Sequence, residues 1–103
     1  MSYGILERDI EYIRKALETF PEVEQAILFG SRAMGNYKRG SDVDIVFKGN
    51  KINQHICNKI SYLLNEEYPV PYFVEVISYN QISNEELRNH IAHYGKVIYN
   101  KSE

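Results

Sequence analysis

Cysteine, long apolar runs and tryptophan are scarce or missing in this 103-residue chain, and the first two absences narrow its class. The single cysteine, Cys57, cannot form an internal disulfide, which fits a reducing compartment. No stretch approaches the roughly 18 apolar residues of a membrane span. The N-terminal segment carries early charges and does not resemble a secretory signal. We therefore expect a cytoplasmic protein with no membrane partner.

An excess of either charge is also missing. The chain has 12 Lys and Arg against 14 Asp and Glu, a net charge of -2. Without a global positive field, no direct nucleic-acid binding is expected. With 44% hydrophobic and 25% charged residues, the composition is that of an ordinary globular protein. The length suits one small domain, which we place at residues 1–103.

Apolar residues recur at spacings of three and four in three segments, which predicts three amphipathic helices. The residues that mark them are Leu6, Ile10, Ile13, Leu17 and Phe20, then Ile52, Ile56, Ile60 and Leu63, then Leu87, Ile91 and Tyr94. Asn50 is expected to cap the second helix, and 83–86 (Ser-Asn-Glu-Glu) to form a capping box for the third. Extended segments are predicted over 23–29, 42–48, 72–77 and 96–99, the first central in its sheet. This order predicts an α/β (α+β) fold, a small mixed β-sheet with flanking helices.

Two acids, Asp42 and Asp44, open the strand predicted at 42–48. Residues two apart on a strand share a face, so the two carboxylates project together with about 6.6 Å between their Cα atoms. Such a pair can hold one Mg²⁺ and share a second roughly 4 Å away. For so short a motif alone, an idle, solvated Asp-x-Asp is the commoner explanation.

The segment that follows the first strand strengthens the metal interpretation. Gly30 removes a Cβ where a phosphate would approach, and Ser31 can begin a helical turn whose N–H groups face it, although a plain turn is the alternative. Arg32 is the best candidate cation for the phosphate tail, ahead of Lys38 and Arg39. There is no Walker loop in this segment.

A third acid, Glu75, lies inside the apolar strand predicted at 72–77. A carboxylate there is costly unless it is paired or bound to a metal, so Glu75 can complete a triad with Asp42 and Asp44 and act as general base. The alternatives are a buried salt bridge and an edge strand with its face open. On the last predicted helix, Glu86, His90 and His93 resemble a zinc face, but a polar surface stripe is favoured over it.

These motifs together resemble a known family. Leu-Phe-Gly-Ser-Arg-Ala-Met-Gly at 28–35 and Gly-Ser-Asp-Val-Asp-Ile-Val at 40–46 are similar to the signature of the polymerase beta-like nucleotidyltransferases, in their minimal nucleotidyltransferase (MNT) branch. The ending Ile-Ala-His-Tyr-Gly-Lys-Val-Ile-Tyr at 91–99 is also similar to that of MNT chains. The resemblance covers most of the chain. It implies the polymerase beta-like fold.

The resemblance also implies a reaction and a site. The reaction is Mg²⁺-dependent transfer of a nucleoside monophosphate, AMP from ATP, to a hydroxyl with release of pyrophosphate. Asp42, Asp44 and Glu75 match the acids that bind two Mg²⁺ ions and catalyse transfer, although the family more often has Asp at the third position. Gly30 and Ser31 match the nucleotide-binding turn, in which Arg32 and Ser41 are included.

Finally, the resemblance implies a partner. Chains of this size are served by a separately encoded helical protein of the HEPN type, often a ribonuclease toxin. The MNT chain is then the antitoxin, in a hetero-oligomer or as a homodimer, and some members add AMP to a tyrosine of the toxin. Two alternatives are a binding module that neutralises the partner by contact alone and a small-molecule transferase of the antibiotic-modifying kind.

Overall fold

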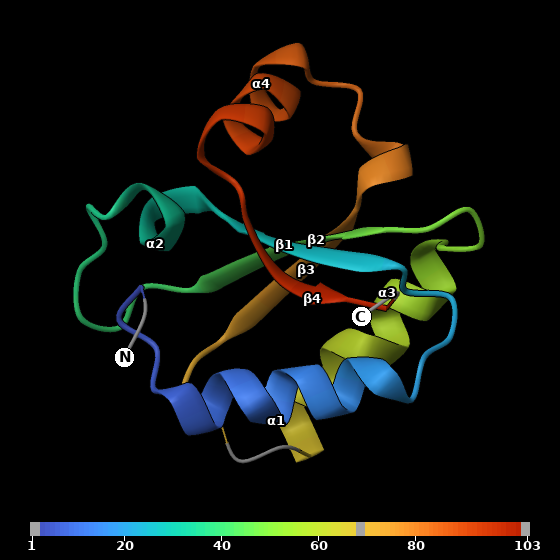
Figure 1. The fold of residues 1–103 in the computed structure, drawn as a ribbon, viewed down its shortest axis with the longest axis horizontal. Helices are drawn as coiled ribbons and strands as arrows, with labels where there is room; N and C mark the ends of the chain where they lie inside the picture. Colours follow the sequence, from blue (N-terminus) through green and yellow to red (C-terminus); the bar gives the residue numbers. More distant parts are fainter. Residues whose placement is uncertain (1–2, 68–69, 102–103) are drawn as a thin grey trace.

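The computed structural model describes residues 3–67 and 70–101 of the chain. Within these residues, four strands form one mixed sheet in the order β3-β2-β1-β4 (Figure 1). They are β1 (Gln25–Phe29), β2 (Val43–Lys48), β3 (Val74–Ser78) and β4 (Lys96–Asn100). β1 pairs antiparallel with β2 and β4, whereas β2 and β3 are parallel. The predicted mixed sheet and the central position of the first strand are confirmed.

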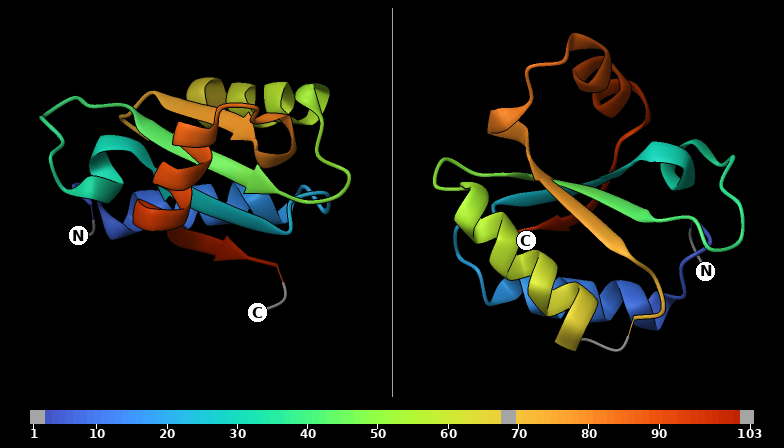
Figure 2. Two further views of the ribbon diagram at one scale, coloured as in Figure 1. Left: turned by 90° about the horizontal axis from the view of Figure 1, so that it is seen from above. Right: turned by 180° about the vertical axis from the view of Figure 1, so that it is seen from behind.

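Helices cover both faces of this sheet. α1 (Glu7–Glu18) and α3 (Gln54–Tyr62) lie on one face, and α4 (Glu85–Tyr94) stands on the other, as Figure 2 shows from two sides. A short helix, α2 (Gly30–Met34), directly follows β1. A π-helical turn, η1 (Leu63–Glu67), extends α3, and a 3-10 turn, η2 (Tyr79–Gln81), follows β3. None of the helices in the described part of the chain is long and apolar enough to cross a bilayer.

Strand β2 divides its side chains between the two faces. Val43, Ile45 and Phe47 are fully buried in the larger core, against α1 and α3. Val46 belongs to a smaller apolar cluster under α4, together with Ile27 and Ile91. Because side chains two apart share a face, Asp44 lies on the α4 side of the sheet. The strand therefore anchors itself with one set of residues and presents its acid with the other.

The helix caps differ from those predicted. Asn53, and not Asn50, caps α3 by accepting a hydrogen bond from the Ile56 N–H at 2.9 Å. The chain is still turning at Asn50, whose own N–H donates to Glu24. Asn84 caps α4 by accepting from the Leu87 N–H, so the predicted capping box on 83–86 is wrong. In both cases the helix begins after a later asparagine than the expected cap, so the position of the first helical turn, and not the residue type, selects the cap.

Candidate active site

The acids predicted from sequence meet at one edge of the sheet, through strand register. Asp44 of β2 is the direct Cα partner of Glu75 of β3. Neighbouring strands lie about 4.8 Å apart, so two acids at one register position bring their carboxyl groups together. Their side chains share a hydrogen bond. We call Asp42, Asp44 and Glu75, with Gly30 beside them, the acid edge.

Asp44 carries the electrostatic consequence of this meeting. Burial first, then the charges of Glu75 and Asp42 and the hydrogen bond to Glu75, together raise the pKa of its carboxyl to about 6. The charge of Arg32 acts the other way. Like charges that converge in a partly buried place disfavour ionisation, and a bound cation would relieve them. A perturbed carboxyl of this kind is typical of functional sites.

Gly30 brings the main chain against Asp44. Its neighbour Phe29 is the register partner of Asp44, and Gly30 itself adopts a left-handed φ of +78°. A Cβ at Gly30 would lie 2.3 Å from the Asp44 Oδ2 atom. No side chain fits between the turn and the carboxyl, so glycine is required here both by backbone conformation and by space.

Glu75 is exposed, and so is Asp42. Glu75 therefore does not lie inside a buried strand, because β3 is an edge strand of the sheet and Phe73, two residues before Glu75, is 58% exposed. The open-edge alternative describes its surroundings. What gathers the three acids is the pairing of β2 with β3, and not a cost of burial.

Arg32 and Ser41 form hydrogen bonds that hold the loop leading into β2. The Arg32 side chain is only 3% exposed, and it donates two hydrogen bonds to the Ser41 carbonyl, at 3.1 and 2.7 Å, and one to the Tyr3 carbonyl. The rings of Tyr37 and Tyr72 also lie against its guanidinium. The Ser41 hydroxyl accepts from the Lys38 N–H. Direct phosphate contact by Arg32 stays a prediction; the observed bonds hold the segment that precedes Asp42.

A residue that the sequence interpretation placed on a polar surface stripe contacts this site. The Gly30 N–H donates to the His90 Nε2 atom at 2.9 Å. His90 is half-buried, its ring packed against Phe29 and Tyr94. Its spacing gave a signal, since it lies three residues after the half-buried Leu87, a helical spacing that puts both residues on the inward side of α4.

Within residues 3–67 and 70–101, no group of three or more His, Cys, Asp or Glu side chains is already arranged as a metal site. The donor chemistry of the acid edge nevertheless suits Mg²⁺, which takes a few carboxylates and leaves positions for phosphate oxygens. The raised pKa of Asp44 supports the same fit, because carboxylates that repel one another are what a divalent cation stabilises.

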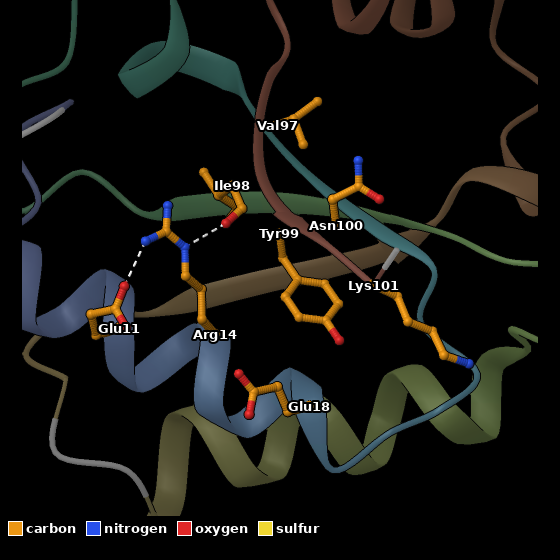
Figure 3. Close-up of a pocket in the computed structure, with 8 residues that line it drawn as sticks. All are labelled: Glu11, Arg14, Glu18, Val97, Ile98, Tyr99, Asn100 and Lys101. Atoms are coloured by element: carbon orange, nitrogen blue, oxygen red, sulfur yellow. Dashed lines mark hydrogen bonds and ion pairs between the residues drawn. The ribbon is translucent and has the colours of Figure 1, made fainter. Parts of the chain in front are cut away.

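A second charged region lies away from the acid edge, in a groove of about 740 Å³ between α1 and β4 (Figure 3). Arg14 pairs there with Glu11 at 2.6 Å and donates to the Ile98 carbonyl at 2.7 Å. Lys101 donates to the Pro21 carbonyl. Burial, and then the charge of Glu18, raises the pKa of Tyr99. We call this region the α1–β4 groove.

A family model described as polymerase beta, nucleotidyltransferase, matches residues 11–103. A search of curated proteins found no match.

Solved structures with this fold include a toxin–antitoxin with AMP-PNP, with a TM-score of 0.73 and 20% identity over 89% of this chain and 73% of that one. A tri-AMPylated Shewanella oneidensis HEPN toxin in complex with MNT antitoxin gives 0.68 and 15% over 93% and 73%. A putative nucleotidyltransferase from Sulfolobus solfataricus gives 0.58 and 20% over 91% and 78%. At these identities the likeness concerns the fold.

Proposed function

This chain belongs to the polymerase beta nucleotidyltransferase family, and on that premise we propose that it transfers AMP from ATP to a hydroxyl, on a tyrosine of a HEPN-type partner, and acts as its antitoxin. One observation carries the proposal: Asp44 and Glu75 meet at one register position, beside a glycine turn that no side chain can fill. A structural neighbour that pairs an MNT antitoxin with a tri-AMPylated HEPN toxin supports the choice of acceptor.

In this proposal the three acids hold the metal. Asp42, Asp44 and Glu75 would bind Mg²⁺, two ions at full occupancy. When bound, Mg²⁺ neutralises charge on the triphosphate and on the leaving pyrophosphate. A cation would stabilise the ionised form of Asp44, whose pKa is raised to about 6 by burial first and then by the charges of Glu75 and Asp42.

The remaining groups bind and orient the reactants. Gly30 gives a phosphate access to the main chain, and the adjacent Ser31 hydroxyl supplies a donor. Glu75 is exposed on its edge strand, so it is the acid best placed to accept a proton from an incoming hydroxyl. Arg32 and Ser41 hold the loop before Asp42 and thereby fix where the first acid lies.

The open acid edge suits a macromolecular acceptor. Large apolar side chains are exposed on the two helices nearest to it, Met34 at 43% on α2 and Tyr94 at 39% on α4. α2 and α4 pack against each other, so these side chains flank the turn that begins at Gly30. Aromatic residues and methionine are enriched at protein interfaces. A helical partner docked there would bring its own hydroxyl to the acids.

A second candidate function is neutralisation by contact alone. The observation that favours it is that the described acids are not already grouped as a metal site. In that case the acid edge would be a charged docking surface, and its carboxylates would contribute to partner affinity without supporting transfer.

The test uses ATP labelled on its α-phosphate, Mg²⁺ and the helical protein encoded by the neighbouring gene. Label should move to a tyrosine of that protein with the wild-type chain and not with Asp42→Asn/Asp44→Asn. The matched control is Glu11→Gln/Glu18→Gln, which removes two carboxylates from the α1–β4 groove and should transfer normally. Full transfer by the Asp42/Asp44 variant would sink the proposal. Neutralisation of the partner without any transfer would establish the second candidate.

A further inference from the structure

The turn between β1 and α2 is held by a residue distant in sequence. The Gly30 N–H is the first of α2, and the first N–H groups of a helix have no partner within it. Phe29, at the N-cap position, offers no side-chain acceptor. His90 of α4, 60 residues away, accepts this hydrogen bond through Nε2 at 2.9 Å. The His90 side chain therefore caps the N-terminus of α2 at the Gly30–Ser31 turn.

His90 is itself held on several sides. The Phe29 ring meets it edge-on, with 6.2 Å between centroids, and the Tyr94 ring lies 5.4 Å away. Its neighbour Ile91 is buried under the sheet. The end of α4 approaches β1 closely, since a Cβ at Gly95 would lie 2.7 Å from Ile27. The imidazole is therefore fixed relative to β1, the strand from which the turn leaves.

The hydrogen bond also fixes the form of the imidazole. An Nε2 atom that accepts a hydrogen bond carries no proton, so the ring is neutral and its proton is on Nδ1. Gly30 thus lies against the Asp44 carboxyl, which leaves no room for a Cβ, and its N–H is hydrogen-bonded to His90. These two contacts together determine where the Gly30–Ser31 turn lies.

We propose that His90 is a positioning residue of the nucleotide site: its Nε2 atom holds the Gly30–Ser31 turn beside Asp44, so that the triphosphate meets a turn already in place. The nucleotide part of this role rests on the proposed function. Without the His90 acceptor, the Gly30 N–H bonds to water instead. The Gly30–Ser31 turn can then move away from the Asp44 carboxyl. His90 contacts no reacting atom and acts through the main chain of Gly30.

Three variants separate hydrogen bonding from packing. His90→Gln carries a carbonyl oxygen that can reach Gly30 as Nε2 does, whereas His90→Leu fills space and accepts nothing. His93→Leu is the matched control, because His93 is an exposed histidine one turn further along α4. Should His90→Leu fail to fold, His90→Asn replaces it, since its shorter side chain does not reach Gly30.

The first measurement needs no nucleotide. Nuclear magnetic resonance should detect nitrogen–nitrogen coupling across the hydrogen bond between Gly30 and His90 in the wild type. Amide exchange of Gly30 should quicken about ten-fold in His90→Leu, the size expected for one lost hydrogen bond, and stay slow in His90→Gln and His93→Leu. Absence of the coupling, or equal exchange in His90→Leu, would overturn the proposal whatever the protein binds.

The second measurement is calorimetric affinity for Mg²⁺-ATP. His90→Leu should bind about ten-fold more weakly, and His90→Gln and His93→Leu within about two-fold of the wild type. Equal affinity in His90→Leu would refute the positioning role. Failure of the wild type to bind Mg²⁺-ATP would instead refute the proposed function, and the coupling and exchange results would still decide whether His90 holds the turn.

Discussion

The acid edge and the α1–β4 groove both collect charged side chains, and they arrange them in opposite ways. In the groove, Arg14 is matched by Glu11 and by a main-chain carbonyl, and Lys101 by another carbonyl. At the acid edge, carboxyl groups face one another, and the pKa of Asp44 rises to about 6. In the groove each cation has a partner, whereas at the acid edge like charges lie close together, and we propose that a cation compensates them.

The larger cavity and the more strongly perturbed ionisable group therefore lie in different regions of the molecule. The groove holds about 740 Å³ of space, yet its two cations, Arg14 and Lys101, already have partners. The acid edge instead brings the carboxyl groups of Asp42, Asp44 and Glu75 close enough for their charges to raise the pKa of Asp44. Functional sites are expected where ionisable groups are kept in unfavourable surroundings, and at the acid edge Asp44 is such a group.

The largest expected effect comes from closing the space beside Asp44. Gly30→Ala places a Cβ 2.3 Å from Oδ2 at a φ of +78°, so we expect it to destabilise the fold by about 2–4 kcal/mol. The measurement is denaturant unfolding. Gly35→Ala is the control, because Gly35 also has a positive φ but nothing within 4 Å, and it should cost only about 1–2 kcal/mol. Equal losses in the two variants would show that Asp44 does not press on the turn.

A smaller effect of opposite sign is expected from Asp44 itself. Its folded pKa of about 6 exceeds the ordinary 3.8, so the folded chain holds this proton more tightly than the unfolded chain. The stability that this proton contributes is complete below pH 3.8 and is lost as pH rises towards 6. Since Asp44 is only partly buried, the loss is about 1 kcal/mol after solvent screening.

Asp44→Asn should therefore stabilise the protein at pH 7 by about 1 kcal/mol and flatten this part of the stability profile. Thermal unfolding in EDTA between pH 4 and 8 measures both, with Glu11→Gln as the groove counterpart. An Asp44→Asn variant that is less stable than the wild type at pH 7 would contradict the claim that the ionised Asp44 carboxylate destabilises the folded chain.

The smallest effect belongs to the groove. Arg14→Leu removes one partly exposed ion pair and one hydrogen bond, so it should cost at most about 1 kcal/mol. Affinity for Mg²⁺-ATP should not change. A nucleotide-binding defect in this variant would mean that the groove, and not only the acid edge, contributes to the site.

Much of the fold could be predicted from local pattern. Period-two spacing predicted a strand over 42–48, and the burial of Val43, Ile45 and Phe47 confirms its inward face, although β2 begins at Val43 and Asp42 directly precedes it. Helical spacing located α1, α3 and α4. The caps were harder, because Asn50 and Asn53 precede α3, and Ser83 and Asn84 precede α4, and only the position of the first helical turn selects Asn53 and Asn84.

The site itself depends on register and long-range contact. That Glu75 stands opposite Asp44 follows from how β3 pairs with β2, which no local pattern specifies. Phosphate contact by Arg32 stays a prediction, and its hydrogen bonds to the Ser41 carbonyl, nine residues away, could not be foreseen from local pattern. His90 reaches Gly30 across 60 residues, so only its place on the inward stripe of α4 gave a signal.

The most direct test of the account is calorimetric binding of ATP in Mg²⁺ and in EDTA, on the wild type, Asp42→Asn/Asp44→Asn and Glu11→Gln/Glu18→Gln. The account predicts Mg²⁺-dependent binding that is lost in the Asp42/Asp44 variant and retained in the Glu11/Glu18 variant. Binding that survives in the Asp42/Asp44 variant, or that disappears in the Glu11/Glu18 variant, would contradict the assignment of the nucleotide site to the acid edge.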